Sequence, residues 1–304
     1  MSIYTIENLL SNIADSDDPL NKKILKSRVR HLIADALDVK PTSRFDVEYQ
    51  FHSRVNFMKS LMRDNGLKSL VLGISGGVDS LTAALICKSA VTDMRMLTGN
   101  PDYKFIAVKL PYKTQKDADY VDLALDTIEP DVIEDINIAD MVDSLTMALE
   151  NTAFKEKTDA QKDFIRGNIK ARSRMMAQYA LANTYGGMVI GTDHAAEAVS
   201  GFFTKFGDGA CDVTPLTGLV KSQVRALAEY RGGPREIYEK VATADLEDLD
   251  VNKPDEEALG VSYDTIDTFL LCEEDISDED FFIIAERYVA TEHKRQQPVS
   301  PFDA

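Results

Sequence analysis

Short apolar runs alternate with longer amphipathic segments through the middle of the chain. The runs at 69–74, 104–110, 131–138 and 188–191 have the length and composition of buried strands. The segments between them repeat apolar residues at the spacing of helices packed on a sheet. Strands alternating with helices predict an α/β fold with a doubly wound parallel sheet and right-handed crossovers. Helices are expected at 46–65, from the loop after 74 to about 90, and at 115–128, 139–149, 158–185, 221–230, 262–271 and 278–292.

Both ends of the chain carry further helical pattern. Residues 1–45 are predicted to form a helical N-terminal extension, since 22–37 places Val29 and Ile33 on one side of a helix. We expect this extension to be peripheral to the functional site, and residues 46–304 to form a single domain with flanking helices. Before the last two helices the pattern is irregular, with a glycine-punctuated loop at 201–212 and an acidic, loop-like stretch at 244–260.

The first predicted strand ends in a glycine-rich loop, Ser75-Gly76-Gly77-Val78-Asp79-Ser80. Ligands of open α/β sheets bind at the carboxyl ends of strands, and glycines let the backbone amides approach an anion. The loop is not a P-loop because no Gly-Lys-Ser/Thr follows, and Asp79 instead offers a carboxylate to Mg²⁺. The alternative is that Ser75 and Asp79 merely cap a helix. The complete motif resembles that of the ATP pyrophosphatases, which cleave ATP between its α- and β-phosphates and adenylate a substrate.

A second candidate segment, Gly191-Thr192-Asp193-His194-Ala195-Ala196-Glu197, follows the last predicted strand. It should therefore lie beside the first loop at the same edge of the sheet. Glu197 is placed to join Asp79 as an oxygen ligand of Mg²⁺. His194 is more typical of a satisfied histidine at a helix start than of a catalyst, and Asp193 of a helix cap.

The predicted long helix carries a basic stripe, because Arg166, Lys170 and Arg174 recur every four residues. The spacing alone fits a solvated face as well as a binding face. Gly167 indicates close packing or a close approach, since a glycine inside a helix costs about 1 kcal/mol relative to alanine.

The loop at 201–212 combines glycines with one lysine, two aspartates and three phenylalanines. This composition predicts a mobile lid that closes over charged substrates. A plain surface loop is the alternative, but its aromatic side chains would be costly to expose. Cys211 is interpreted as structural. The stretches 243–248 and 292–295 are weak signals by themselves, because such charged runs usually face solvent.

Composition narrows the class of protein. A net charge of −17 argues against nucleic acid as a partner, because such binding depends on neutralising phosphates. No apolar run approaches the roughly 20 residues of a membrane span. The N-terminus lacks the order of a signal peptide, and three widely spaced cysteines imply neither disulfides nor zinc. We therefore expect a cytoplasmic protein.

Together these segments make residues 46–303 similar to the ammonia-dependent NAD synthetases. The resemblance depends on the glycine-rich loop and on five further motifs, which occur in this order: Arg-Gly-Asn-x-x-Ala-Arg, Gly-Thr-Asp-His-Ala-Ala-Glu-Ala, Gly-Phe-Phe-Thr-Lys-Phe-Gly-Asp-Gly, Thr-Ala-Asp-Leu-Glu-Asp and Glu-His-Lys-Arg. It implies a homodimer whose interface helps to build the dinucleotide site.

The resemblance also implies roles for particular residues. ATP would contact Gly73, Ile74, Ser75, Gly76, Gly77, Val78, Asp79, Ser80, Thr192, Lys221 and Thr243. Nicotinic acid adenine dinucleotide (deamido-NAD) would contact Arg172, Lys205, Asp212, His293 and Lys294. Mg²⁺ would be held by Asp79 and Glu197. The catalytic candidates are Asp208, which would position or deprotonate ammonia, and Lys205, which would screen the charge of the reacting anions.

The implied reaction needs no nucleophilic side chain, because the substrate carboxylate attacks ATP and ammonia then displaces AMP to give NAD. One alternative is another adenylating amide-forming enzyme, such as the ATPase half of GMP synthetase. Another is a non-catalytic nucleotide sensor on the same scaffold. A glutamine-dependent NAD synthetase would need a glutaminase domain, for which 45 unmatched residues are too few. Free ammonia, or a separate donor protein, is therefore the expected nitrogen source.

Overall fold

The computed structural model describes residues 3–114, 117–243 and 254–301. Its described part contains one four-stranded sheet, in which β1 (Ser69–Gly73), β2 (Lys104–Lys109), β3 (Val132–Asp135) and β4 (Gly187–Val189) lie in the order β3-β2-β1-β4. Every neighbouring pair of strands is parallel. The predicted doubly wound parallel sheet is therefore confirmed, and each predicted strand exists.

The strand order reverses beside β1. From β1 the chain proceeds outward to β2 and β3, and α7 (Asp159–Tyr185) then returns it to β4 on the other side of β1. Parallel strands that diverge in this way leave a crevice outside their carboxyl ends, where ligands of such sheets bind. The loops that follow β1 and β4 therefore meet at the same place.

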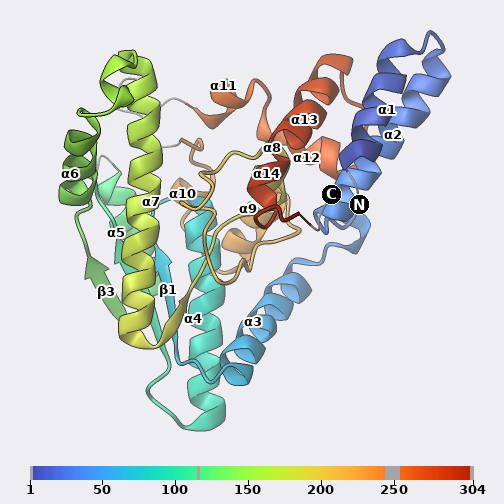
Figure 1. Ribbon diagram of the computed structural model, residues 1–304. Coiled ribbons are helices and arrows are strands. Elements are labelled where there is room, and N and C mark those ends of the chain that lie inside the picture. Colours follow the sequence, from blue (N-terminus) through green and yellow to red (C-terminus); the bar gives the residue numbers. More distant parts are fainter. Residues whose placement is uncertain (1–2, 115–116, 244–253, 302–304) are drawn as a thin grey trace.

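Helices cover both faces of the sheet (Figure 1). One face packs against α3 (Val47–Asp64), α4 (Val78–Thr98), α5 (Ala118–Ile128) and α9 (Lys221–Tyr230), and the other against α6 (Ala139–Leu149) and α7. Because side chains alternate along a strand, Leu70 and Leu72 join the first core while Val71 joins the second. The continuous apolar run in β1 is thus explained by burial on both faces.

A third hydrophobic core lies away from the sheet, where α1 and α2 run beside α13 in Figure 1. It joins α1 (Ile3–Asp15), α2 (Pro19–Ala36), α8 (Ala195–Ser200), α12 (Tyr263–Leu271) and α13 (Asp278–Ala290). Ile33 and Phe281 are fully buried within it. The N-terminal helices therefore share a core with the C-terminal ones and with α8.

Several predicted boundaries were wrong. The helix expected to end near 90 continues to Thr98, because its apolar face continues through Met94 and no glycine interrupts it before Gly99, whose φ is 67°. The last helix stops at Ala290, and a short α14 (Glu292–Arg295) follows. The stretch expected to be loop-like at 244–260 contains α11 (Asp255–Leu259), while 244–253 lie outside the described residues.

Short elements that the pattern did not indicate are α10 (Arg235–Tyr238) and the 3-10 helices η1 (Thr42–Arg44) and η2 (Ala153–Glu156). The helix predicted at 115–128 begins at Ala118, and residues 115 and 116 lie outside the described part. Within the described residues, no helix is both long and apolar enough to cross a membrane.

Candidate active site

A cavity of about 710 Å³ opens at the crevice between β1 and β4. It is lined by most of the residues that the sequence singled out: Gly73, Ile74, Ser75, Gly77, Val78, Asp79, Ser80, Thr192, Glu197, Asp208, Lys221, Thr243 and Lys294. Residues more than 200 positions apart in the sequence thus line the same cavity. The topology, rather than any local motif, brings them together.

The glycine-rich loop presents the start of α4 to this cavity. The N-cap of α4 is Gly77, and no side chain caps the helix, so Asp79 is not a capping residue and the capping alternative is wrong. Ser75 and Ser80 lock the loop, because their hydroxyls lie 3.1 Å apart and Ser80 also donates to the Gly77 carbonyl. An uncapped helix N-terminus at a cavity wall favours an anion.

Asp79 forms a largely buried ion pair with Lys221, the first residue of α9. The Lys221 Nζ lies 2.8 Å from Oδ2 and 3.0 Å from Oδ1 of Asp79. Burial by itself would raise the pKa of Asp79, but the charge of Lys221, the contact with His194 and the hydrogen bonds from Lys221 together outweigh it and hold that pKa below its usual range. Burial by itself would lower the pKa of Lys221, but the charges of Asp79 and Glu197 and the hydrogen bond to Asp79 together raise it. Both groups are therefore charged at neutral pH.

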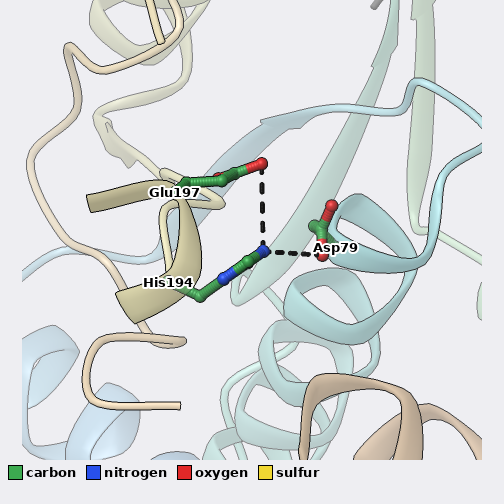
Figure 2. Close-up of side chains that lie close together, drawn as sticks. All are labelled: Asp79, His194 and Glu197. Atoms are coloured by element: carbon green, nitrogen blue, oxygen red, sulfur yellow. Dashed lines mark ion pairs between the residues drawn. The ribbon is translucent and has the colours of Figure 1, made fainter. Parts of the chain in front are cut away.

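His194 lies between Asp79 and Glu197, as Figure 2 shows. Its Nε2 is 3.3 Å from Asp79 Oδ1 and 3.8 Å from Glu197 Oε1, and one ligand atom from each residue lies within 4.8 Å of the others. Among the residues that the structure describes, neither ring nitrogen has a hydrogen-bond partner of acceptable geometry, so the prediction of a satisfied histidine is wrong. Burial lowers the pKa of His194, and the ring is therefore neutral at physiological pH.

Three acidic side chains, Glu197, Asp193 and Asp208, lie close to one another and to Asp79. Burial is the largest cause that raises the pKa of Glu197, followed by the charge of Asp79. Burial and the nearby Asp208 raise the pKa of Asp193 to about 7. Crowded carboxylates of this kind are relieved by a cation. Sequence analysis assigned Asp193 to a cap, although its place in the same motif as Glu197 was a signal for a site residue.

Lys221 is held in place by α12. Asp267 accepts hydrogen bonds from the backbone amides of Lys221 (2.9 Å) and Ser222 (2.7 Å). The Lys221 Nζ also lies 4.7 Å from the ring centre of Tyr263, which gives a cation–π contact. Sequence reasoning missed both Asp267 and Tyr263, because one acid and one tyrosine in a helix carry no local signal.

The basic stripe of α7 is not a solvated face. Lys170 is 3% exposed and lies over the Tyr112 ring, and Arg174 donates from Nε to the Leu110 carbonyl. The stripe packs against the segment that follows β2, while Gly167 and its neighbours line the cavity. Gly167 is buried at this wall, where α7 borders the cavity.

The loop at 201–212 is tied to α14. Lys294 Nζ donates to the carbonyls of Gly201 and Phe203, each at 2.8 Å, and Lys205 Nζ donates to the His293 carbonyl. Inside the loop the Thr204 amide donates to Asp208 Oδ1 at 2.9 Å. Phe206 is 56% exposed, contrary to the expectation that the loop shields its aromatic side chains. Motion of this loop stays a prediction.

The remaining predicted residues are not among those that line the cavity. Arg172 donates to the Lys205 carbonyl at 3.2 Å, so both lie with His293 at an exposed rim. Asp212 lies next to β4, where its Oδ2 accepts a hydrogen bond from the Val189 amide at 2.7 Å. Gly76 supports the loop, since its φ is 79° and an added Cβ would come 2.9 Å from Tyr120. Of the predicted 243–248 segment, residues 244–248 lie outside the described part.

Cys211 fits its structural interpretation, because burial raises the pKa of its thiol to about 12.

The parallel sheet and the glycine-rich loop at its switch point define an α/β protein with the adenine-nucleotide α-hydrolase fold. The NAD synthase family profile matches residues 50–298. The NH3-dependent NAD+ synthetase of Pseudomonas syringae pv. syringae (strain B728a) is 52% identical over 275 residues, 90% of this chain and 99% of that protein. The chain belongs to the NAD synthase family, a family of enzymes, and the resemblance inferred from the motifs is confirmed.

Solved structures agree with this assignment. The NAD+ synthetase from Burkholderia pseudomallei superposes with a TM-score of 0.77 at 42% identity, covering 90% of this chain and 98% of that one. The NMN synthetase from Francisella tularensis gives a TM-score of 0.73 at 29% identity, covering 84% and 99% respectively.

Proposed function

We propose that this protein catalyses the final step of NAD synthesis, the ATP-dependent amidation of deamido-NAD with ammonia. The observation that carries the proposal is the match, over nearly the whole of both chains, to a relative named for NH3-dependent NAD+ synthesis. The cavity supports it, because one volume combines a helix N-terminus, the Asp79–Lys221 pair and two further acidic groups, Glu197 and Asp208.

ATP is proposed to occupy the cavity with its phosphates at the loop 73–80. The amides of the loop and the α4 N-terminus supply partial positive charge there. Lys221 adds a full charge, and Thr192 and Thr243 offer hydroxyls from the cavity lining. This arrangement stabilises the charge that grows on pyrophosphate as the bond between the α- and β-phosphates breaks.

Mg²⁺ is proposed as the cation that accompanies ATP, with Asp79 and Glu197 as its protein ligands. The residues fit this role, because carboxylates from the first turns of α4 and α8 converge on one point, and burial and the charge of Asp79 raise the pKa of Glu197, a strain that a cation would relieve. When bound, the ion would screen the repulsion between the substrate carboxylate and the phosphates.

The chemistry proceeds in two displacements. A carboxylate oxygen of deamido-NAD attacks the α-phosphorus of ATP, and pyrophosphate leaves. Ammonia then attacks the carbonyl carbon of the acyl-adenylate, gives up a proton and expels AMP, which completes the amide of NAD. We assign Asp208 to position ammonia, because its carboxylate lines the cavity and is fixed by the Thr204 amide. Lys205 is assigned to charge screening when the loop moves inward.

The dinucleotide is proposed to bind through Arg172, Lys205 and His293 at the rim, together with Lys294 in the cavity lining and Asp212 beside β4, with a second copy of the chain completing the site. Support comes from apolar side chains that are exposed on α6 and α7, among them Met147 (73%) and Phe164 (61%). Phe164 also lines the cavity, so a partner that covered it would border the substrate. A homodimer in light scattering is the expected result. We also propose a cytoplasmic location, where ATP is available.

The deciding experiment is incubation with ATP, Mg²⁺, ammonium and deamido-NAD, with NAD and AMP as the measured products. A parallel arm replaces deamido-NAD with nicotinic acid mononucleotide, because one structural relative is named an NMN synthetase. Another arm replaces ammonium with glutamine. NAD and AMP in equal amounts, formed fastest from deamido-NAD and ammonium, support the proposal. ATP binding without either product would leave the nucleotide-sensor alternative, and preference for the mononucleotide would change the substrate.

A further inference from the structure

The imidazole of His194 is buried without a hydrogen bond. Its side chain is 0% exposed, and both ring nitrogens lack a partner of acceptable geometry among the described residues. A buried polar group left unsatisfied costs about 1–3 kcal/mol, so such a group is usually explained by a bound ligand or a function. Figure 2 shows Nε2 directed at the space between the Asp79 and Glu197 carboxylates.

The distances around Nε2 are close to those of a coordination sphere. Asp79 Oδ1 lies 3.3 Å away and Glu197 Oε1 3.8 Å away. Around an octahedral cation with ligand bonds of about 2.0–2.1 Å, neighbouring ligand atoms lie roughly 3 Å apart and opposite ones roughly 4.2 Å apart. The three atoms here lie within 4.8 Å of one another and would therefore move slightly closer together around an ion. Asp79 can also keep its shorter contact to Lys221, which is made by Oδ2 at 2.8 Å, while Oδ1 turns to the ion.

We propose that His194 Nε2 is a third protein ligand of the cation held by Asp79 and Glu197, and that it makes the site bind Mn²⁺ more tightly than Mg²⁺. Mg²⁺ prefers oxygen ligands and keeps its waters, whereas imidazole nitrogen is a better ligand for divalent transition ions. The neutral ring supplies the required lone pair from Nε2 in the tautomer with its proton on Nδ1, so the cation accounts for Nε2 and not for Nδ1. The proposal rests on the cation site of the proposed function but not on the reaction.

Mn²⁺ binding to the full-length, metal-free protein tests this inference without nucleotide. Free Mn²⁺ is counted by electron paramagnetic resonance, and Mg²⁺ affinity is obtained by competition. The wild type is expected to bind Mn²⁺ about tenfold more tightly than Mg²⁺. His194→Gln is expected to weaken Mn²⁺ binding about tenfold and Mg²⁺ binding far less. Glu197→Gln should weaken both ions, and His31→Gln, on an exposed histidine, should change neither.

Electron spin echo modulation of bound Mn²⁺ provides a direct readout, because a coordinated imidazole gives a ¹⁴N coupling. We expect this coupling in the wild type, its replacement by the ¹⁵N pattern after labelling with ¹⁵N-histidine, and its loss in His194→Gln. The labelled wild type decides the matter even where the variant does not fold, as judged by circular dichroism. Absence of nitrogen coupling, or unchanged Mn²⁺ affinity in a folded His194→Gln, overturns the inference.

The outcome separates this inference from the proposed function. A protein that forms NAD with Mg²⁺ but shows no nitrogen coupling loses the His194 ligand and keeps its activity assignment. A protein that shows nitrogen coupling but forms no NAD keeps the His194 ligand and loses its activity assignment.

Discussion

Asp79 and Lys221 are both largely removed from water in the cavity wall. Each charge is therefore stabilised mainly by the other. Lys221→Met keeps the length of the side chain but leaves the Asp79 carboxylate without its ammonium at 2.8 Å. Breaking a buried pair on one side costs about 3–5 kcal/mol, so we expect a loss of this order in the free energy of unfolding. Turnover should fall at least about 100-fold, because the phosphates also lose a donor.

Urea unfolding and NAD formation measure these two effects of Lys221→Met. The matched control is Lys59→Met, which removes a partly exposed pair with Asp93 and should cost no more than about 1 kcal/mol. If Lys221→Met were as stable and as active as this control, the pair would have neither role.

The close contacts around Gly76 can be tested by substituting alanine. An alanine there would place Cβ 2.9 Å from Tyr120 Cβ and 3.0 Å from the Val121 amide, at a φ of 79°. Gly66 has a similar φ of 65° but nothing within 4 Å of an added Cβ. Gly66→Ala should therefore cost about 1 kcal/mol of strain, and Gly76→Ala roughly 1–3 kcal/mol more through the clash. Thermal unfolding compares them, and equal losses would show that the loop can yield.

Among the structural elements, the loop 201–212 is held both by its own hydrogen bonds and by α14. Lys294→Met removes the two 2.8 Å hydrogen bonds to the Gly201 and Phe203 carbonyls. We expect amide exchange in the loop to accelerate about tenfold, because local opening no longer has to break these bonds. Hydrogen exchange with mass spectrometry measures this. Lys68→Met, which loses only an exposed pair with Asp102, should leave the loop unchanged.

The elements also show how far sequence reasoning extends. The strands and the loop 75–80 were predictable, because a buried parallel strand is apolar throughout and the loop is continuous in sequence. The rule that ligands bind at strand ends was enough to place Glu197 beside Asp79. Asp267 and Tyr263 were not predictable, because they act on Lys221 through tertiary packing between α9 and α12. The four-residue spacing of the basic residues on α7 also could not show that Lys170 is buried.

Across the whole molecule, the N-terminal helices are more integrated than the motifs implied. The match to the Pseudomonas syringae relative spans 275 residues, which is longer than the segment 46–304. Part of residues 1–45 therefore has a counterpart in that relative, and the estimate that all of them were unmatched was wrong. The packing agrees, since Ile6 and Ile33 lie in one core with Phe269, Val199 and Ala196. Because α8 carries Glu197, this core also supports the candidate cation site.

Arg30 links the N-terminal helices to this core. The side chain is 6% exposed, and Nε and Nη1 donate to the carbonyls of Phe269 (2.9 Å) and Glu274 (2.7 Å), while Nη2 donates to that of Thr268. Arg30→Met keeps the aliphatic stem but removes every donor, and it leaves carbonyls at the end of α12 without their partner. We expect a loss of about 2–4 kcal/mol in the free energy of unfolding, since a charged donor serves several buried acceptors.

Urea unfolding measures this loss, with Arg28→Met as the control on an exposed position of the same helix. If the third core supports α8, cation affinity in Arg30→Met should also fall, although Arg30 lies on another element and touches no candidate ligand. Reduced stability with unchanged cation affinity would mean that the contacts of α8 on its sheet side hold it in place without help from the third core. A variant as stable as Arg28→Met would instead show that water can replace the guanidinium at the end of α12, and that the N-terminal helices are held by apolar packing.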